Sequence, residues 1–368
     1  MATVTTTVIR RALIIMAVSV LLSSCETINY YGQAAQGQLN ILFSGRDITR
    51  LLADEDLDSQ LRQQLELVLE IREFAADELA LPVADNYSTY VDLKRDYAVW
   101  NVFAADEFST EPRDWCFPVA GCVIYRGYFS EAGANRYGQQ LVEDGLDVYI
   151  GGVAAYSTLG WFSDSLPSSV IERSPSRLAA LIFHELAHQV VYVRSDTIFN
   201  ESFATTVERE GLRRWLKARG TQTAQAGQGA QQAEEEGEAP TLAEQEKYQI
   251  DFVALVNKYR KRLDAVYATE LEPDAMRAEK ARVQEELRAA YAELKITWSS
   301  NGGDSYDGYD AWFAGPLNNA QLATVAYYND LVPAFTQLLA GVNGDLPSFY
   351  ALVRKEGRRD AGEQLLGR

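Results

Sequence analysis

Hydrophobic residues recur at helical spacing in the first third of this chain, between residues 59 and 80. Leu61, Leu65, Val68 or Leu69, and Phe74 recur at helical spacing, and Pro82 follows them. Apolar positions that repeat every three to four residues share a helix face, and proline cannot continue a helix. The pattern predicts an amphipathic helix that ends before Pro82.

Two further helices are predicted in the middle of the chain. Ser174 and Pro175 begin the first, because serine caps helix N-termini and proline fits the first helical position. The residues that follow contain no glycine or proline up to a polar break at residues 194–197. The second helix covers about residues 198–218 and ends at Gly220. The break allows the second helix to fold back antiparallel onto the first.

The last third of the chain is also predicted to be helical. Residues 247–296 carry two helical patterns separated by Pro273, which indicates an antiparallel hairpin. A loop rich in Gly, Asp and Tyr follows at 299–319. A helix near 317–340 contains Pro333, which predicts a kink or break at that position.

Residues 96–156 differ from the rest of the chain, because short β-branched and aromatic runs alternate there with turn residues. This texture predicts a small, mainly antiparallel sheet. Residues 221–246 contain almost no large apolar residue, which predicts a disordered insert. Together the patterns predict an α+β, helix-rich domain over residues 46–368, with the helical hairpin inserted in it.

Composition and charge exclude one class of partner. The chain is 47% hydrophobic and 23% charged, as globular proteins are, and its net charge is −18 at pH 7. Such a field repels phosphate backbones, so no nucleic-acid partner is expected. Part of the charge is local, since residues 233–246 contain six glutamates and no basic residue.

The first 24 residues have the layout of a secretion signal. Arg10 and Arg11 precede an apolar stretch over residues 12–22, which is shorter than the roughly 20 residues of a membrane-spanning helix. The sequence LSSC, which ends at Cys25, resembles the lipobox of bacterial lipoproteins, in which the cysteine is lipidated and becomes the mature N-terminus. The alternative is an ordinary cleaved signal with an incidental cysteine.

A lipidated Cys25 would anchor the protein to the membrane of a bacterial cell envelope, with residues 25–45 as a tether. Glu26 stands where aspartate is associated with retention in the inner membrane. The resemblance therefore favours an outer-membrane lipoprotein that faces the periplasm.

Cys116 and Cys122 are the only cysteines beyond Cys25. A close pair on either side of a loop, in an oxidising compartment, is typical of a disulfide. The alternative is a buried pair of free thiols. A CxxC-type metal site is disfavoured because the spacing between the two cysteines is too wide.

Both histidines of the chain lie in the sequence FHELAH, as His184 and His188. Residues four apart share a helix face, so two imidazoles can be directed at one metal ion. Glu185 points about 100° away, near enough to reach a water molecule at the metal without being a ligand. This is the HExxH pattern of zinc proteases.

A catalytic zinc site has three protein ligands and one open position. Glu201 follows His188 after the break and would lie over the two histidines when the second helix folds back. The alternative for Glu201 is a first-turn glutamate that the helix dipole favours. The sequence predicts one Zn²⁺ per chain, bound by His184, His188 and Glu201.

HELAH followed by NESFATTVE resembles the gluzincin metallopeptidases, especially the aminopeptidase branch, although the interval before the glutamate is shorter here than in that branch. The lipobox, CFPVAGCVIYRGYF, AAYSTLGWFSD and PLNNAQLATVAYYNDLVPAF are similar to the bacterial lipoprotein family of predicted aminopeptidases, over nearly all of the mature chain apart from 221–246. The resemblance implies a zincin-like catalytic domain, with Glu185 as the general base that takes a proton from water.

In gluzincins a tyrosine or histidine from a later segment stabilises the oxyanion. No third histidine exists here, so a tyrosine is required. Tyr327 is the first candidate, because it lies in the segment most typical of the family. Tyr328, Tyr306 and Tyr309 are the alternatives.

Glu208 lies seven residues after Glu201, on the same helix face, and could accept the free N–H of a zinc-binding histidine. The alternative is an exposed glutamate. Residues 147–162 could form an edge strand that pairs with an extended peptide, with Gly151 and Gly152 permitting close approach. A buried strand of the core sheet is the alternative.

The sequence thus predicts a zinc-dependent peptidase that acts on peptides, of the aminopeptidase type. Such an enzyme needs a carboxylate to hold the substrate ammonium group, and the candidates are Asp144, Asp147, Asp164, Asp304, Asp307 and Asp310. The alternative is a non-enzymatic envelope lipoprotein in which zinc is structural and the hairpin at 247–296 binds a partner. The lack of a fourth protein ligand near HExxH favours catalysis.

Overall fold

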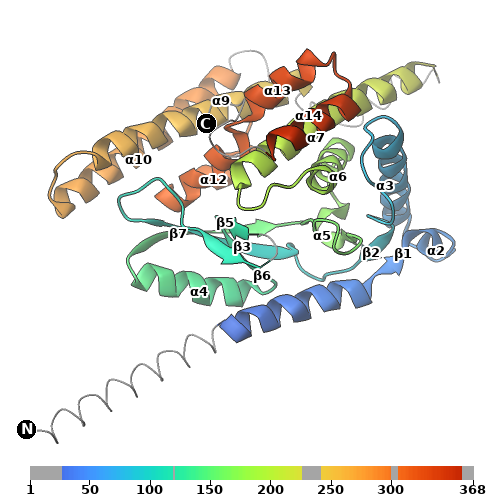
Figure 1. Cartoon of the computed structure of the whole chain (residues 1–368), viewed down its shortest axis with the longest axis horizontal. Coiled ribbons are helices and arrows are strands. Elements are labelled where there is room, and N and C mark those ends of the chain that lie inside the picture. Colours follow the sequence, from blue (N-terminus) through green and yellow to red (C-terminus); the bar gives the residue numbers. More distant parts are fainter. Residues whose placement is uncertain (1–26, 119–120, 226–241, 300–305, 359–368) are drawn as a thin grey trace, which may run out of the picture.

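The fold is described by a computed structural model, which covers residues 27–118, 121–225, 242–299 and 306–358. Helices surround small β-sheets on both sides (Figure 1), so the predicted α+β, helix-rich class is confirmed. None of the helices in these ranges is long and apolar enough to cross a membrane.

The main sheet has three antiparallel strands. Strand β3 (Val99–Asp106) lies in the centre, between β6 (Arg126–Tyr128) and β7 (Leu146–Val153). Helix α4 (Glu131–Glu143) covers one face of this sheet, and the other face points toward the larger helices (Figure 1). The second face is therefore free to form one wall of a pocket.

Helix α4 was not predicted from the sequence. Its N-terminus is capped by Ser130, whose side chain accepts a hydrogen bond from the backbone N–H of Gly133. Gly133 and Gly138 weaken the helical pattern, since glycine disfavours helices. Gly138 is nevertheless required, because a Cβ atom there would lie only 2.8 Å from the side chain of Ile150 on β7.

A second small sheet contains β1 (Arg46–Asp47), β2 (Thr89–Val91) and β8 (Leu166–Pro167). Strands β1 and β2 are antiparallel, whereas β2 and β8 are parallel. A two-stranded hairpin is formed by β4 (Trp115–Phe117) and β5 (Gly121–Val123). Within residues 96–156 the described strand pairs are all antiparallel, as predicted, and the parallel β2–β8 pair lies outside that range.

The largest hydrophobic core lies among helices. Helices α3 (Ser59–Asp77), α6 (Pro175–Val190) and α7 (Thr197–Gln225) contribute to it, and Phe183 and Phe203 are fully buried there. Burial of each phenylalanine side chain contributes about 2 to 3 kcal/mol. The shorter helices are α2 (Ile48–Leu52), α5 (Ser168–Ile171), α11 (Asp310–Phe313), α13 (Val332–Gly341) and α14 (Leu346–Glu356).

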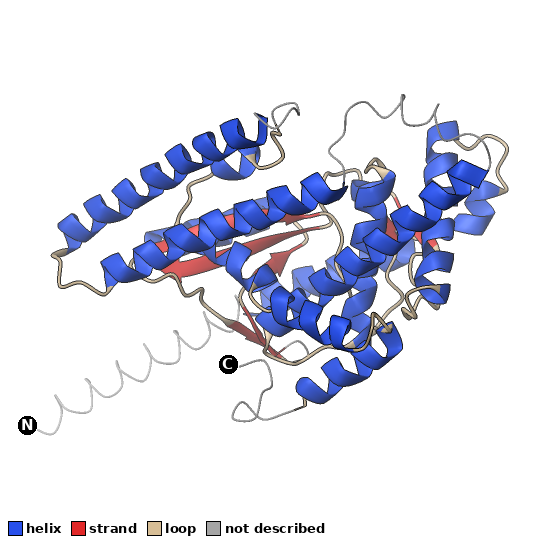
Figure 2. Cartoon of the chain, turned by 90° about the horizontal axis from the view of Figure 1, so that it is seen from above, coloured by secondary structure: helices blue, strands red, loops and turns tan. Residues whose placement is uncertain are grey.

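The hairpin consists of α9 (Leu242–Tyr267) and α10 (Pro273–Ser299), which lie side by side (Figure 2). Its aromatic residues pack with those of the following loop, and Tyr291 stacks on Phe313 at a centroid distance of 3.8 Å. The buried amine of Lys280 forms an ion pair with Asp147 of β7 at 2.6 Å. The hairpin is therefore part of the domain's packing.

The predicted break near Pro333 is present. Helix α12 (Asn319–Asn329) ends before Asp330, and α13 starts with Pro333 in its first turn. Proline has no backbone N–H and fits the first turn of a helix, so it begins a new helix here.

Two predictions need correction. The expected tether at 25–45 is helical over residues 27–44. The helix was not predicted because the Gly- and Gln-rich sequence obscures the face that packs on the sheet. The expected disordered insert at 221–246 is helical at both ends, since α7 extends to Gln225 and α9 begins at Leu242; the residues between lie outside the described ranges.

Candidate functional site

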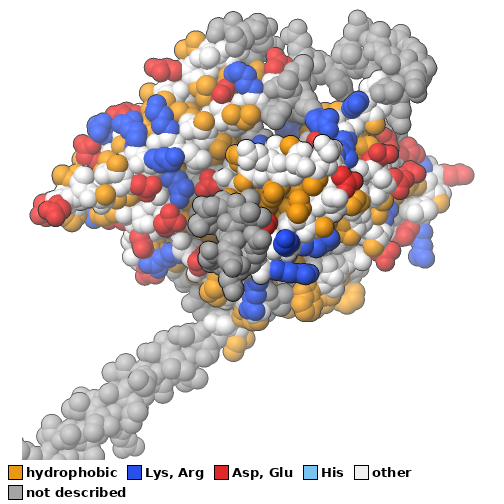
Figure 3. Space-filling model, turned by 45° about the horizontal axis from the view of Figure 1, so that its top comes forward, with side chains coloured by type: hydrophobic (Ala, Val, Ile, Leu, Met, Phe, Trp, Pro, Cys, Tyr) orange, Lys and Arg blue, Asp and Glu red, His pale blue; other side chains and the backbone are white. Residues whose placement is uncertain are grey.

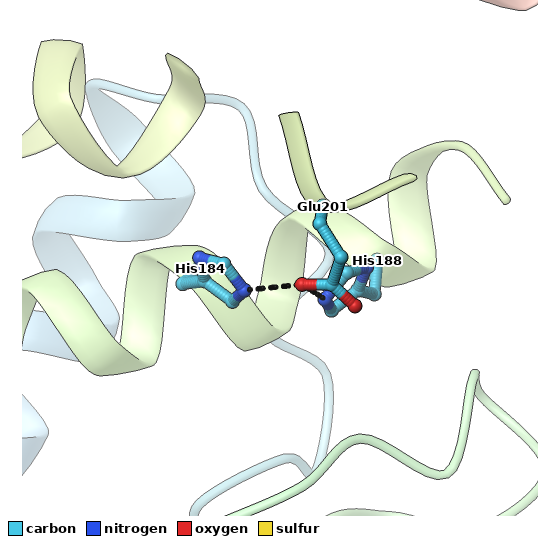
Figure 4. A group of neighbouring side chains, drawn as sticks. All are labelled: His184, His188 and Glu201. Atoms are coloured by element: carbon cyan, nitrogen blue, oxygen red, sulfur yellow. Dashed lines mark hydrogen bonds and ion pairs between the residues drawn. The ribbon is translucent and has the colours of Figure 1, made fainter. Parts of the chain in front are cut away.

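Two histidines and one glutamate converge between α6 and α7. His184 and His188 lie one turn apart on α6, and Glu201 reaches them from the first turns of α7 (Figure 4). Oε2 of Glu201 is 3.3 Å from Nε2 of His184 and 3.7 Å from Nε2 of His188. Ligands about 2.1 Å from a tetrahedral zinc ion lie about 3.4 Å from one another. The separations therefore fit a metal site.

Hydrogen bonding at His184 supports the same conclusion. Its Nδ1 atom lies 2.9 Å from Oε2 of Glu208, and a carboxylate only accepts hydrogen bonds, so Nδ1 carries the proton. The Nε2 atom of neutral His184 then presents a lone pair to the carboxylate of Glu201. Two acceptors in contact repel each other unless a proton or a cation lies between them. His184, His188 and Glu201 could thus hold a metal ion.

The pKa values of these groups show how strongly they are coupled in the absence of a cation. Burial alone lowers the pKa of His184, but the hydrogen bonds that the carboxylates of Glu201 and Glu208 accept from the ring outweigh burial and hold the pKa well above its usual value. Burial lowers the pKa of His188 to about 4, despite the opposing effect of Glu201. The carboxyl of Glu201 has a lowered pKa, since the two histidines outweigh its burial.

The turn before α7 positions Glu201. The side-chain Oδ1 of Asn200 accepts a hydrogen bond from the backbone N–H of Val193 at 2.7 Å, and its Nδ2 donates to the backbone carbonyl of Val193 at 2.8 Å. Asp196 caps the helix by accepting from the N–H of Phe199. The Asn-Glu pair of the sequence therefore has two roles, since Asn200 fixes the turn from which Glu201 extends.

The hairpin β4–β5 supports that turn from outside. A disulfide joins Cys116 and Cys122 across the hairpin. The backbone N–H of Cys122 donates to Oγ of Ser195 at 3.0 Å. Gly121 has a φ of +80°, and a Cβ atom there would collide with Ser195 and Arg194. Glycine is therefore needed for the hairpin to contact the turn.

Glu185 is buried beside the three possible ligands. It points away from them around the helix, and its carboxyl has a pKa raised to about 7, mainly by burial. Tyr87 and Asp164 lie near Glu185. The pKa of the fully buried Tyr87 is raised by its own burial and by the carboxylates of Glu185 and Asp164. A carboxyl whose pKa lies near neutrality can both accept and return a proton.

A cavity of about 680 Å³ opens on the metal-binding side of these residues. Its walls come from α6, from the free face of the main sheet and from the β4–β5 hairpin. The lining includes His184, Glu185, His188, Glu201, Glu208 and the sheet residues Val99, Asn101, Gly127, Gly152 and Val153. The fourth coordination position of a metal ion would therefore face a pocket large enough for a peptide segment.

Gln189, the residue after HELAH, connects α6 to two loops. Its Nε2 donates to Oδ2 of Asp164 at 3.0 Å and to Oδ1 of Asn86 at 3.1 Å. Asp164 also accepts hydrogen bonds from Thr158 and Ser157. These contacts fix the segment at 157–164, which continues from β7 into the wall of the pocket.

The structure does not describe the side chains of Tyr327 and Tyr328, although both belong to α12. Tyr306 and Tyr309 stack on Tyr248 and Phe252 in the aromatic cluster of the hairpin, and they do not line the pocket. The expected lipidation site, Cys25, lies outside the described residues.

Four tyrosines that sequence reasoning missed line the pocket, namely Tyr30, Tyr125, Tyr156 and Tyr192. Of these, Tyr125 and Tyr192 lie near Glu201. Tyr125 follows β5, and Tyr192 lies four residues after His188. Burial raises the pKa of Tyr125, and the nearby carboxylate of Glu201 raises it further. The same two effects raise the pKa of Tyr192. The four-residue spacing from His188 was the only sequence signal for Tyr192.

The aspartates expected to hold a substrate ammonium group are engaged elsewhere or lie away from the pocket. Asp147 is paired with Lys280, Asp310 with Lys295, and Asp164 with Gln189. Asp144 is the C-cap residue of α4, and Asp307 does not line the pocket. Asp304 lies outside the described residues.

The fold and the site define an α+β protein with a candidate metal centre of two histidines and a glutamate in a pocket. Residues 29–364 match the sequence profile of a family described as putative aminopeptidase, and the chain belongs to this family. No curated protein and no solved structure shows detectable similarity to the chain.

Proposed function

We propose that this protein is a zinc-dependent peptidase, in which His184, His188 and Glu201 bind the metal and Glu185 is the general base. The observation that carries the proposal is the convergence of these three ligand atoms on one side of a pocket, with Glu185 buried next to them. Histidine nitrogen and carboxylate oxygen are the donor set of catalytic zinc sites. Membership of the aminopeptidase family agrees with this chemistry.

A bound zinc ion would make water acidic and polarise the substrate carbonyl. The carboxylate of Glu185 takes the proton of the attacking water and then delivers it to the departing amine. Glu208 holds the N–H of His184 and so keeps Nε2 of that ring directed at the metal. The buried position of Glu185 keeps bulk water from competing for its proton.

A tyrosine hydroxyl is proposed to stabilise the oxyanion. Tyr125 has the best support, because it lines the pocket close to Glu201 and makes no hydrogen bond to the described residues through its hydroxyl. A tyrosine with a raised pKa stays protonated and can donate. Tyr327 remains the candidate that the family resemblance favours.

The substrate is proposed to pair with β7. The carbonyl of Gly127 on β6 accepts a hydrogen bond from Gln33, so it points away from β3. The carbonyl of Ala104 on β3 accepts from the backbone N–H of Arg113, so it points away from β7. In an antiparallel sheet alternate residues bond to opposite sides, so the backbone groups of Ile150 and Gly152 on β7 point away from β3. These edge groups can bind an extended peptide, and Gly152 lines the pocket.

Metal analysis and hydrolysis of a mixed peptide library test the proposal. The purified protein is expected to contain one zinc ion per chain and to cleave peptides, and Glu185→Gln is expected to keep the metal but lose nearly all hydrolysis. Full activity in the Glu185→Gln variant would exclude the mechanism. The position of cleavage in each peptide decides between exopeptidase and endopeptidase.

The alternative is a non-enzymatic lipoprotein with a structural zinc and a partner-binding hairpin. Within the described residues only three protein ligands meet at the site, whereas structural zinc sites normally have four. Figure 3 shows basic and acidic side chains intermingled along the hairpin, at the left of the view. Several form ion pairs with one another, such as Arg282 with Glu279 and Glu286. The hairpin surface therefore shows no apolar docking stripe in this view.

Attachment to an outer membrane by lipidated Cys25 remains a proposal. Support comes from the helix at residues 27–44, which contains no charged residue and lies along the outer side of the molecule below the sheet (Figure 1). Its inner face packs on the sheet through Tyr30 and Gln33. Ile28, Tyr31, Leu39 and Phe43 are exposed on the other face.

This apolar stripe could lie in the bilayer surface beside the lipid attached to Cys25. It would then add a second membrane contact, because a single acyl chain binds a membrane only reversibly. Flotation with outer-membrane lipid vesicles tests this. Leu39→Ser with Phe43→Ser should release part of the lipidated protein, and Cys25→Ser should release it or block maturation. Soluble wild-type protein with no lipid on its N-terminal peptide would contradict the proposal.

A further inference from the structure

Two arginines enter the pocket next to the candidate metal centre. Arg173 lies just before α6, and Arg177 is in the first turn of that helix. Arg177 precedes His184 by seven residues, so both lie on one helix face, about 10 Å apart along the axis. The arginines and the metal ligands therefore face one cavity, in a line along α6.

Within the described part of the chain these two arginines have no paired counter-ion. In the ranges that the structure covers, neither guanidinium forms an ion pair or a hydrogen bond, whereas Arg213, Arg214 and Arg282 all pair with glutamates. Arg173 is partly buried, and its pKa is lowered by burial and by the adjacent Arg177. Two neighbouring like charges at the edge of a cavity favour the entry of an anion.

The carboxylates of the pocket do not neutralise the arginines. Glu201 and Glu208 are bonded to His184. Glu185 exerts an attraction on Arg173 without an ion pair. With a divalent metal ion at the candidate site, the ion and the two arginines would outweigh the three glutamates of the lining, so the pocket would be positive. This is the reverse of what an ammonium-binding subsite requires, and none of the five described aspartates proposed for that role is found in the lining.

We propose that Arg173 and Arg177 form a subsite for a substrate carboxylate, so that the pocket selects peptides with a carboxylate a few residues from the cleaved bond. This inference rests on the proposed peptidase function. The planar guanidinium group binds carboxylates through two parallel hydrogen bonds. A separation of about 10 Å corresponds to about three residues of extended peptide. The carboxylate is the C-terminus of a short peptide or an acidic side chain.

Four tetrapeptides distinguish a C-terminal carboxylate from a side-chain carboxylate as the group that binds the arginines. Tetra-alanine as the free acid is compared with its C-terminal amide, and Ala-Ala-Glu-Ala amide is compared with Ala-Ala-Gln-Ala amide. The variants are Arg173→Gln, Arg177→Gln and Arg177→Lys, with Arg136→Gln as the control. Arg136 is exposed on α4, on the opposite side of the main sheet. Zinc content and melting temperature show whether each variant is folded.

We expect kcat/KM of the wild-type protein to be about 10- to 100-fold higher for one carboxylate-bearing peptide than for its neutral partner, as two charge-assisted hydrogen bonds allow. Arg177→Gln should remove this preference, Arg177→Lys should restore part of it, and Arg136→Gln should leave it unchanged. A preference for the free acid identifies the C-terminus, and a preference for glutamate identifies a side chain.

The inference is overturned if the wild-type protein shows no preference, or if Arg177→Gln lowers kcat/KM equally for all four peptides. Calorimetric binding to the zinc-loaded Glu185→Gln variant, with and without Arg177→Gln, separates the two proposals. If no peptide is cleaved but the carboxylate peptide binds in an Arg177-dependent way, the peptidase proposal fails and the subsite stands. If peptides are cleaved and binding is independent of Arg173 and Arg177, only the subsite fails.

Discussion

The side chain of Asn200 holds both backbone polar groups of Val193, at 2.7 and 2.8 Å, directly before Glu201. Asn200→Ala removes the partner of both groups in a partly buried turn, which should cost about 1 to 2 kcal/mol. Glu201 should also be held less firmly, so zinc affinity should fall at least tenfold. Chemical denaturation and competition with a chelator measure the two effects. Asn135→Ala, at an exposed site on α4, is the control, and an equal zinc affinity in both variants would contradict the role of the turn.

Glu208 orients His184 through its Nδ1 atom. Glu208→Ala should lower zinc affinity by about 10- to 100-fold, as loss of a carboxylate that supports a metal-binding histidine does. His188→Ala should abolish zinc binding altogether, since it removes a ligand. Zinc content after dialysis measures both. Glu66→Gln, on the exposed side of α3, should behave like the wild type; full zinc occupancy in His188→Ala would refute the proposed ligand set.

Burial of Glu185 predicts a dependence of stability on pH in the metal-free protein. The pKa of its carboxyl is about 7 in the native state and 4.5 without the fold. Above pH 7 the carboxylate is ionised in both states and destabilises the native one by about 3 kcal/mol, whereas below pH 4.5 it is protonated in both and the effect vanishes.

Glu185→Gln should therefore raise the melting temperature of the metal-free protein at pH 8 and have little effect at pH 4. The chelator-treated wild type and variant, melted at both values of pH, provide the comparison. An equal shift at both values would mean that the carboxylate charge is not the cause.

The disulfide between Cys116 and Cys122 closes a short loop whose backbone contacts the turn at Ser195. Replacement of both cysteines by serine should cost about 2 kcal/mol, because the unfolded chain gains freedom. The turn should loosen as well, so hydrolysis should fall with the zinc content. Activity measured in saturating zinc distinguishes loss of metal from loss of shape. Unchanged stability and activity would show that the hairpin does not support the site.

Substitution of Tyr125 or Tyr327 by phenylalanine shows which of the two tyrosines is the oxyanion donor. Removal of one oxyanion donor lowers kcat by about a hundredfold or more, with KM little changed. We expect Tyr125→Phe to show this loss, since Tyr125 lines the pocket beside Glu201. If Tyr327→Phe shows it instead and Tyr125→Phe is silent, the donor comes from α12, as the family resemblance implies.

Much of the metal site could be predicted from sequence because helix geometry is regular. The spacing of His184 and His188 places them on one face whatever surrounds the helix, and the polar break allows α7 to turn back toward them. Helix α4 was missed because its glycines weaken the pattern, whereas close packing on Ile150 stabilises it. Local sequence does not contain such contacts.

The remaining pocket residues could not be predicted because they come from distant segments. Tyr125 and Gly152 reach the site only through pairing of strands and packing of the sheet on helices. Arg177 lies on the face of His184, but an arginine near a helix start is most often a solvated side chain. Only the cavity and the absence of a counter-ion in the described residues distinguish it.

Helix α6 spans 16 residues without an interior glycine or proline and carries Arg177, His184 and His188 on one face. The helix therefore fixes the distance between Arg177 and the candidate metal centre at His184 and His188. Insertion of one residue between Arg177 and His184 would rotate the arginine by about 100° out of the pocket, so this distance cannot lengthen in small steps. Relatives that accept substrates of other lengths would have to vary the opposite wall, formed by the sheet and its loops.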